Sequence, residues 1–305
     1  MKIMLAAPCY DGHELQRVAA VLRSGWLTQG SQVEELEKDF AKYIDVGNAI
    51  AVFNGTCALH TVLSALGVEP GDEILIPSFT FIATANAVLY QNARPVFIDI
   101  DPQTLNINPE DMERKITKRT KGVILVHYGG LPAEMDTVSQ IAEKHGLFVL
   151  EDAAEAIGAV YKGKKVGSLG VAAIFSLHAQ KVITTGEGGI ITTDDEELAE
   201  ACRRIRDHGR DAQTKQFVCL GYNYRMTEMQ AALGVEQLKK IETIIQKRIS
   251  NANYLTKRLV QDHNLVLPQV SPYLRHTFML YTIRVKSGRD ALMEYLNKQG
   301  VEAKV

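Results

Sequence analysis

Short apolar segments alternate with amphipathic ones through most of this chain, and this alternation restricts the fold more than any other feature. Seven segments are almost continuous in apolar residues, as expected for strands covered on both faces. They are Ile50–Phe53, Glu73–Ile76, Pro95–Ile98, Gly122–Val126, Phe148–Leu150, Ala172–Ser176 and Gly189–Thr193. The pattern predicts an α/β fold with a mostly parallel sheet of about seven strands between layers of helices.

Helical spacing of apolar residues occurs between most of these strands. We expect helices over Gly12–Gly25, Val33–Ile44, Cys57–Leu66, Ala83–Tyr90, Pro109–Ile116, Met135–His145 and Glu196–Arg206. In the first of them, the expected apolar face contains Leu15, Val18, Ala19 and Leu22. No helical pattern lies between Leu150 and Ala172, where AVYKGKKVGSLG indicates a hairpin or a loop.

The last part of the chain predicts a smaller α/β unit. A long charged helix is expected at about Thr227–Leu259, followed by a strand at Phe278–Val285 and a helix at Arg289–Gln299. The chain then stops at Val305, within the strand-like VEAKV. We therefore expect a large domain at 1–238 and a partial, apparently truncated C-terminal domain at 239–305.

Composition excludes several classes of protein. The 305 residues are 46% apolar and carry a net charge of −2, with no long basic block, so neither a nucleic acid nor a membrane surface is an expected partner. No segment is apolar enough to span a membrane. The four cysteines are far apart and lack metal-site spacing, which indicates reduced thiols, no bound metal and a soluble, cytoplasmic protein.

Asn54-Gly55-Thr56 lies between an expected strand and an expected helix. The first amides of a helix have no partner within it, so this position suits a phosphate group. The alternative is an ordinary N-cap by Asn54 or Thr56. Neither a GxxxxGK[ST] nor a GxGxxG sequence is present here, which argues against P-loop and dinucleotide sites.

Two further segments place ionisable groups at expected strand ends. Glu151 and Asp152 follow one strand, where ligands of open parallel sheets bind, although either acid could instead brace a loop. Lys181 follows the strand that ends at Ser176, and an amine at such a buried strand end can become a nucleophile or a base. The alternative for a single lysine is a solvated surface charge.

Phe79-Thr80-Phe81 follows a third strand. Aromatic rings at the rim of a site can stack on a planar ligand, and the alternative is ordinary core packing. Each of these features is weak by itself, and their shared position at strand ends gives them weight together.

In chain order, these segments resemble the nucleotide-sugar aminotransferases of the DegT/StrS type, which are pyridoxal-phosphate enzymes of fold type I. The resemblance extends from Leu27 to Leu238. It rests on NGTCAL, PSFTFIATANAV, VHYGG, EDAAEAIGA, FSLHAQKVITTGEGG and GYNYRMTEMQAALG. It implies pyridoxal 5′-phosphate as cofactor and transfer of an amino group from an amino acid, L-glutamate by resemblance, to a keto sugar attached to a nucleoside diphosphate.

The resemblance also implies roles for individual residues. Lys181 would form a Schiff base with the cofactor, and Asp152 would pair with its ring nitrogen. The other expected cofactor-binding residues are Gly55, Thr56, Cys57 and Ser176 at the phosphate, Phe81 on the ring face, and Glu155 and His178 nearby. A loop of the neighbouring subunit, Gly221–Arg225, would complete the phosphate site through Asn223 and Arg225, which implies a homodimer with shared active sites.

Two departures from the family pattern concern Leu177, where an aromatic residue is more usual, and the short C-terminal part. Relatives with histidine in place of Lys181 dehydrate sugars, so the lysine favours transamination. A dehydratase relative and a non-catalytic regulatory protein that binds the cofactor are the alternative functions.

Overall fold

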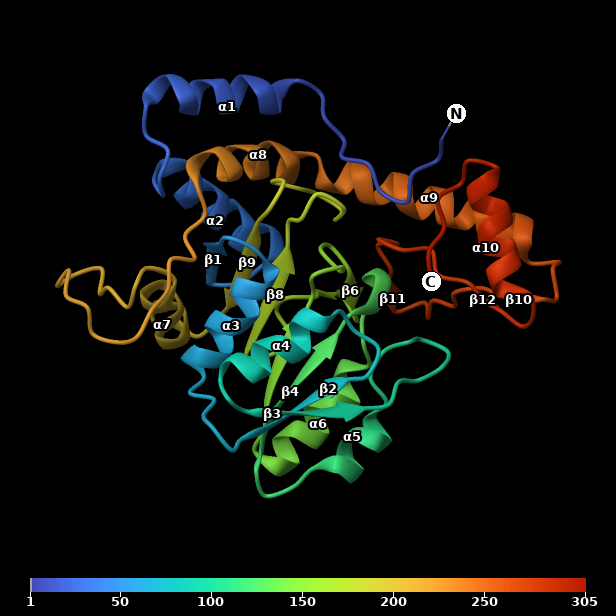
Figure 1. Cartoon of the computed structure of the whole chain (residues 1–305), viewed down its shortest axis with the longest axis horizontal. Helices are drawn as coiled ribbons and strands as arrows, with labels where there is room; N and C mark the ends of the chain where they lie inside the picture. The colour runs from blue at the N-terminus through green and yellow to red at the C-terminus, as the bar shows by residue number, and fades with distance from the viewer. Residues whose placement is uncertain (1) are drawn as a thin grey trace.

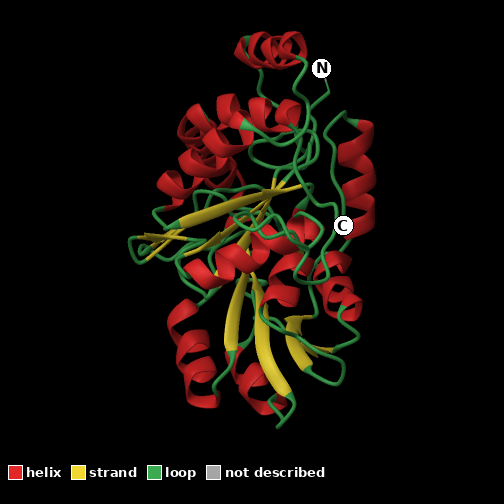
Figure 2. Ribbon diagram, turned by 90° about the vertical axis from the view of Figure 1, so that its left-hand side faces the viewer, coloured by secondary structure: helices red, strands yellow, loops and turns green. Residues whose placement is uncertain are grey.

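A computed structural model describes residues 2–305 of the chain. At its centre lies a seven-stranded sheet with strand order β1-β9-β8-β5-β4-β2-β3 (Figures 1 and 2). The strands are β1 (Asn48–Val52), β2 (Glu73–Pro77), β3 (Arg94–Ile98), β4 (Thr120–Val126), β5 (Phe148–Asp152), β8 (Ala172–Ser176) and β9 (Gly189–Thr193). The predicted seven-stranded α/β fold is confirmed, with strand boundaries close to those expected.

The direction of the strands decides where a ligand can bind. All neighbouring pairs from β8 to β3 are parallel. Only β9 reverses, because it pairs antiparallel with both β1 and β8. β1 therefore runs in the same direction as β8, and the carboxyl ends of β1, β2, β4, β5 and β8 meet at one edge of the sheet.

Helices cover both faces of the sheet (Figure 2). One face packs against α3 (Gly55–Ala65), α4 (Ile82–Tyr90) and α7 (Glu196–Arg206). The other packs against α2 (Ser31–Ile44) and α8 (Glu228–Lys239) at one end and α5 (Pro109–Lys115) and α6 (Met135–His145) at the other. Because successive side chains of a strand point to opposite faces, Ile50 and Ala51 belong to different buried clusters.

The expected long helix at Thr227–Leu259 is wrong in one respect, since it consists of two helices. The break lies at Lys240, between α8 and α9 (Ile241–Leu259), and the Lys240 ammonium pairs with the buried Glu14 carboxylate. Ile241 and Ile245 of α9 lie in the same buried cluster as α2 and α8. The domain boundary at 238/239 stays a prediction.

The expected strand at Phe278–Val285 is also wrong, because only β12 (Arg284–Val285) forms, paired with β10 (Leu265–Val266). Phe278 has a φ of 50°, which does not fit a strand. The amides of Thr277 and Leu280 instead donate to the carbonyls of Gly130 and Gly129, at 3.1 Å each. This segment is therefore fixed to the end of β4 rather than to a second sheet.

The remaining elements are small. Of the hairpin or loop expected before Ala172, the structure shows the hairpin, formed by β6 (Val160–Tyr161) and β7 (Lys164–Lys165). β11 (Leu274–Arg275) pairs with β6. Helix α10 (Arg289–Lys298) forms as expected. The terminal segment VEAKV forms an isolated bridge between Val301 and Ile3 rather than a strand.

Helix α1 (His13–Ser24) forms where it was expected and packs on α8. Val21 and Glu14 are its buried residues, whereas Leu15 and Leu22 are exposed. Two of the four residues of the expected apolar face are therefore exposed within one chain, and Val18 and Ala19 are half-buried.

Residues 2–305 include no helix with the length and apolar character that a membrane crossing requires. Within the same range, no group of histidine, cysteine and acidic residues is arranged to hold a metal ion.

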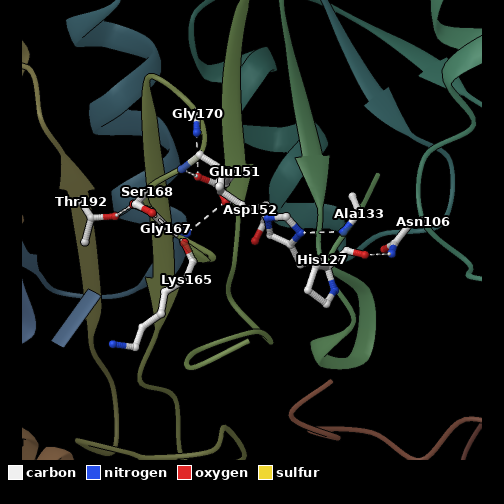
Figure 3. Close-up of polar contacts among 12 residues, drawn as sticks. Asn106, His127, Ala133, Glu151, Asp152, Lys165, Gly167, Ser168, Gly170 and Thr192 are labelled. Atoms are coloured by element: carbon white, nitrogen blue, oxygen red, sulfur yellow. Dashed lines mark hydrogen bonds and ion pairs between the residues drawn. The ribbon is translucent and has the colours of Figure 1, made fainter. Parts of the chain in front are cut away.

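A buried polar network fixes the ends of β4 and β5 (Figure 3). The Glu151 carboxylate accepts hydrogen bonds from the amides of Gly167, Leu169 and Gly170, at 2.8–3.0 Å. The Ala133 amide donates to Nδ1 of His127, so the other ring nitrogen carries the hydrogen and donates to Glu151 at 2.9 Å. Both side chains are fully buried.

We expect Glu151→Gln to lower the free energy of unfolding of the cofactor-free protein by about 3–5 kcal/mol. A carboxylate can accept all four of these hydrogen bonds, whereas an amide offers one oxygen and turns its own donors toward the others. Denaturant unfolding measures the change. Glu143→Gln, at an exposed site on α6, is the matched control and should change stability by less than about 0.5 kcal/mol. Equal stabilities for the two variants would contradict the structural role of Glu151.

Candidate active site

A cavity of about 690 Å³ lies at the edge of the sheet where the parallel strands end. Eight of the eleven residues predicted from the sequence line it. They are Gly55, Thr56, Phe81, Asp152, Glu155, Ser176, His178 and Lys181. Their grouping follows from the topology. The carboxyl ends of β1, β2, β5 and β8 lie at this edge, and the predicted residues end these strands or follow them.

The N-terminus of α3 forms one wall of the cavity. Asn54 caps the helix, and its side chain accepts from the Cys57 amide at 2.9 Å. Asn54 is therefore the N-cap of α3, and Gly55 is the first residue of the helix. Gly55 lies against Ser176, since a Cβ on Gly55 would come within 3.3 Å of the Ser176 Cβ. The first amides of the helix and the hydroxyls of Thr56 and Ser176 thus surround one corner, which suits a phosphate.

Asp152 is 5% exposed and ends β5 at the floor of the cavity. Burial raises the pKa of this carboxyl. Hydrogen bonds from the Thr84 hydroxyl, at 2.9 Å, and from the Ala154 amide, at 3.2 Å, act in the opposite direction, as does the charge of Lys181. The adjacent Glu151 belongs to the buried network on the other side of the strand, so the strand alternation separates the two acids that the sequence placed together.

Lys181 and Glu155, which both line the cavity, form an ion pair. The Lys181 Nζ donates to Glu155 Oε1 at 3.2 Å, and the Gly129 amide donates to Glu155 Oε2 at 3.0 Å. Both side chains are only partly exposed. The amine predicted to be a nucleophile is therefore held by one carboxylate inside the cavity and is not a free surface charge.

Aromatic residues surround the opening. Phe81 is 76% exposed and precedes α4, while the Phe79 ring packs against Tyr128 with 4.8 Å between ring centroids. Met279 and Leu280, from the segment fixed to Gly129 and Gly130, complete the apolar wall.

Three predicted residues lie outside the cavity of this chain. The Cys57 amide is used by the helix cap. Asn223 forms a bridge with Asp207, and the Arg225 guanidinium pairs with the Asp207 carboxylate. Within residues 2–305 of one chain, the segment Gly221–Arg225 therefore does not reach the cavity that Gly55 and Thr56 line.

Several cavity residues were missed by the sequence analysis. Thr84, Tyr128, Gln180, Glu187, Met279 and Leu280 are among them. Thr84 and Tyr128 lie within two of the motifs quoted above, and Thr84 follows Thr80 by one helical turn. Met279 and Leu280 could not be placed, because their segment was expected to be a strand.

The chemistry of these groups fits pyridoxal phosphate. An amine can attach an aldehyde, a buried carboxylate can hold a proton on a ring nitrogen, and a helix N-terminus with two hydroxyls can bind a phosphate. The close packing of Gly55 against Ser176 brings the N-terminus of α3 and the Ser176 hydroxyl to the same corner of the cavity.

Comparison with known proteins gives the same assignment. The DegT/DnrJ/EryC1/StrS aminotransferase family matches residues 8–305. GDP-perosamine synthase from Caulobacter vibrioides is 43% identical over 310 residues, which span 99% of this chain and 84% of the relative. PseC from Helicobacter pylori, an aminotransferase in the biosynthesis of pseudoaminic acid, superposes with a TM-score of 0.93 at 32% identity, over 98% of this chain and 83% of that one.

Spr1654 from Streptococcus pneumoniae, in its PLP form, superposes with a TM-score of 0.95 at 28% identity, over 100% of this chain and 84% of that one. The fold and the residues of the cavity are those expected from the family, which matches residues 8–305. The chain therefore belongs to the DegT/DnrJ/EryC1/StrS aminotransferase family, whose members are pyridoxal-phosphate enzymes that aminate sugars attached to nucleotides.

Proposed function

We propose that this protein transfers an amino group from L-glutamate to a keto sugar attached to a nucleoside diphosphate, with Lys181 and Asp152 as its catalytic residues. The observation that carries the proposal is the presence of the Lys181 amine, the buried Asp152 carboxyl and the N-terminus of α3 in one cavity. Separate sites for these groups could not serve a single small cofactor.

Pyridoxal phosphate, when bound, supplies an electron sink for the carbon that loses or gains the amino group. Lys181 is the point of covalent attachment. Its free Nζ would take the proton from the Cα of the amino-acid donor and, in the second half of the reaction, would deliver a proton to the sugar carbon. Asp152 holds the proton on the ring nitrogen. Glu155 accepts a hydrogen bond from Lys181 and directs the freed amine.

The remaining residues bind and orient the cofactor. Thr56, Ser176 and the amides of Gly55 and Thr56 would hold the phosphate, and Phe81 would pack on the ring face. His178 lies near the opening, 3.9 Å from Glu187. The Lys181 amine favours transamination over dehydration, because a side chain without an amine cannot attach an aldehyde.

A GDP-linked sugar is the preferred substrate under this proposal. The support is the 43% identity with a relative named GDP-perosamine synthase over 99% of this chain. A panel of keto sugars on different nucleotides, assayed with glutamate, would distinguish GDP from other carriers.

A homodimer with shared active sites is the second part of the proposal. Large apolar side chains are exposed before and along α4, in the loop after α7 and around α1. They are Phe81, Ile82, Leu89 and Tyr90, then Phe217, Val218 and Leu220, then Leu15, Leu22 and Trp26. Exposed apolar surface of this extent is typical of an interface. A second copy would also give Asn223 and Arg225 a cavity to complete.

A cytoplasmic location is supported by the four free cysteines, Cys9, Cys57, Cys202 and Cys219. Disulfides are common in oxidising compartments and rare in the cytosol.

Lys181→Ala and Lys181→His are expected to lower the turnover of glutamate-dependent amination by more than about 10³-fold, because both remove the attachment point and the proton carrier. The assay follows 2-oxoglutarate release with the keto sugar nucleotide as acceptor. Borohydride reduction of the cofactor-loaded parent followed by peptide mapping should label Lys181. A label on another lysine, or near-normal turnover in either variant, would contradict the assignment.

Asp152→Asn is expected to lower turnover by about 10²-fold or more, with a small effect on stability, because an amide cannot keep the ring nitrogen charged. Steady-state kinetics and thermal unfolding of the same preparation separate the two effects. Turnover equal to that of the parent would remove Asp152 from the mechanism.

Mixing two inactive proteins tests the shared site. In a heterodimer of Lys181→Ala with the double variant Asn223→Ala/Arg225→Ala, one site keeps both its lysine and an intact neighbouring loop. Random exchange of subunits should therefore restore about a quarter of the parental activity. If the loop serves its own subunit, no site is intact and the mixture stays inactive. Gel filtration gives the oligomeric state of each protein.

A further inference from the structure

A pair of buried hydroxyls lies behind the Asp152 carboxyl, between it and the start of α4. The Thr84 hydroxyl donates to Asp152 Oδ2 at 2.9 Å, and Thr80 Oγ1 lies 2.8 Å from Thr84 Oγ1. Thr84 is fully buried, and Thr80 is partly buried. Because a hydroxyl has one hydrogen, and that of Thr84 is used on Asp152, Thr80 must donate to Thr84.

We propose that Thr84, supported by Thr80, is a positioning residue of the reaction, which holds one oxygen of the Asp152 carboxylate and leaves the other directed at the cofactor ring nitrogen. This proposal rests on the role proposed for Asp152 above. Both hydroxyls donate in one direction, so each strengthens the next, and the last donor stabilises a negative charge.

The need for such a donor follows from the surroundings of Asp152. Burial opposes its ionisation, and the Glu155 carboxylate opposes it further, while the Lys181 ammonium favours it. Lys181 acts on Asp152 only through its charge, because its amine donates to Glu155. His127, directly after β4, donates its backbone amide to the Asp152 carbonyl, while its ring is turned to Glu151. The Thr84 hydroxyl and the Ala154 amide are then the donors that remain on the carboxylate in every state.

Loss of the Thr84 hydroxyl would leave a buried carboxylate short of a donor, and the proton shared with the ring nitrogen would move toward Asp152. A hydrogen bond to a charged group contributes about one to two powers of ten to such an equilibrium. The consequence concerns the protonation of the ring nitrogen rather than the binding of either substrate.

The test uses the cofactor-loaded protein, reconstituted with pyridoxal phosphate carrying ¹⁵N in its ring. In Thr84→Val, which removes the hydroxyl and preserves the shape, we expect the ¹⁵N resonance to move toward the value of unprotonated pyridine. We also expect kcat to fall about 10- to 100-fold, with KM for both substrates changed less than about threefold. Thr84→Ser restores the hydroxyl and should restore both the resonance and kcat.

Thr61→Val is the matched control, because Thr61 is also fully buried and its hydroxyl has no hydrogen-bond partner among residues 2–305. It should leave the resonance and kcat unchanged. An unmoved ¹⁵N resonance in Thr84→Val, whatever happens to kcat, overturns the proposal. If Thr84→Val does not fold, Thr80→Val decides: a smaller movement in the same direction supports the hydroxyl pair, and an unmoved resonance overturns it.

Asp152→Asn in the same experiment separates this proposal from the one on which it rests. If Asp152→Asn moves the resonance and Thr84→Val does not, only the role of Thr84 is wrong. If neither variant moves it, the assignment of Asp152 itself is wrong.

Discussion

The burial of the Asp152 carboxyl is the constraint on which the rest of the site depends. An acidic group that is 5% exposed is stable in its charged form only when hydrogen-bond donors and a positive charge lie close to it. The surrounding elements provide both: α4 through Thr84, the turn after β5 through Ala154, and the segment after β8 through Lys181. The strands β2, β5 and β8 that precede these three segments run parallel, so all three begin at the same edge of the sheet.

The two acidic residues at the end of β5 show how one strand serves two purposes. Glu151 is saturated by hydrogen bonds from a loop and from His127, which leaves it no capacity for a ligand. Its rigidity nevertheless benefits the adjacent Asp152, whose carbonyl accepts from the His127 amide at 3.1 Å. A site built on a strand that is fixed from the opposite face loses little entropy when it binds a charged ring.

The sequence was sufficient to predict the sheet and the cavity residues at the ends of β1, β5 and β8, because both follow from local patterns. Continuous apolar segments indicate buried strands, and glycine, lysine and aspartate at strand ends indicate the site. The reversed direction of β9 could not be predicted, since an apolar strand reads the same in either direction. The exposure of Leu15 and Leu22 on α1 could not be predicted either, because helical periodicity shows that a face is apolar and does not show what covers it.

The conformation of the segment Thr277–Leu280 explains why two cavity residues, Met279 and Leu280, were not predicted. Its apolar residues follow the pattern of a strand, yet the amides of Thr277 and Leu280 bond to Gly130 and Gly129 in a tight loop at the end of β4. Gly129 and Gly130 have positive φ values, of 62° and 98°, and a Cβ on Gly130 would come within 2.4 Å of the Thr277 hydroxyl. The same loop donates the Gly129 amide to Glu155, the partner of Lys181. Met279 and Leu280 of the cavity lining and the Glu155 carboxylate that pairs with Lys181 therefore depend on the same turn of backbone. This dependence between distant segments cannot be recognised from either segment alone.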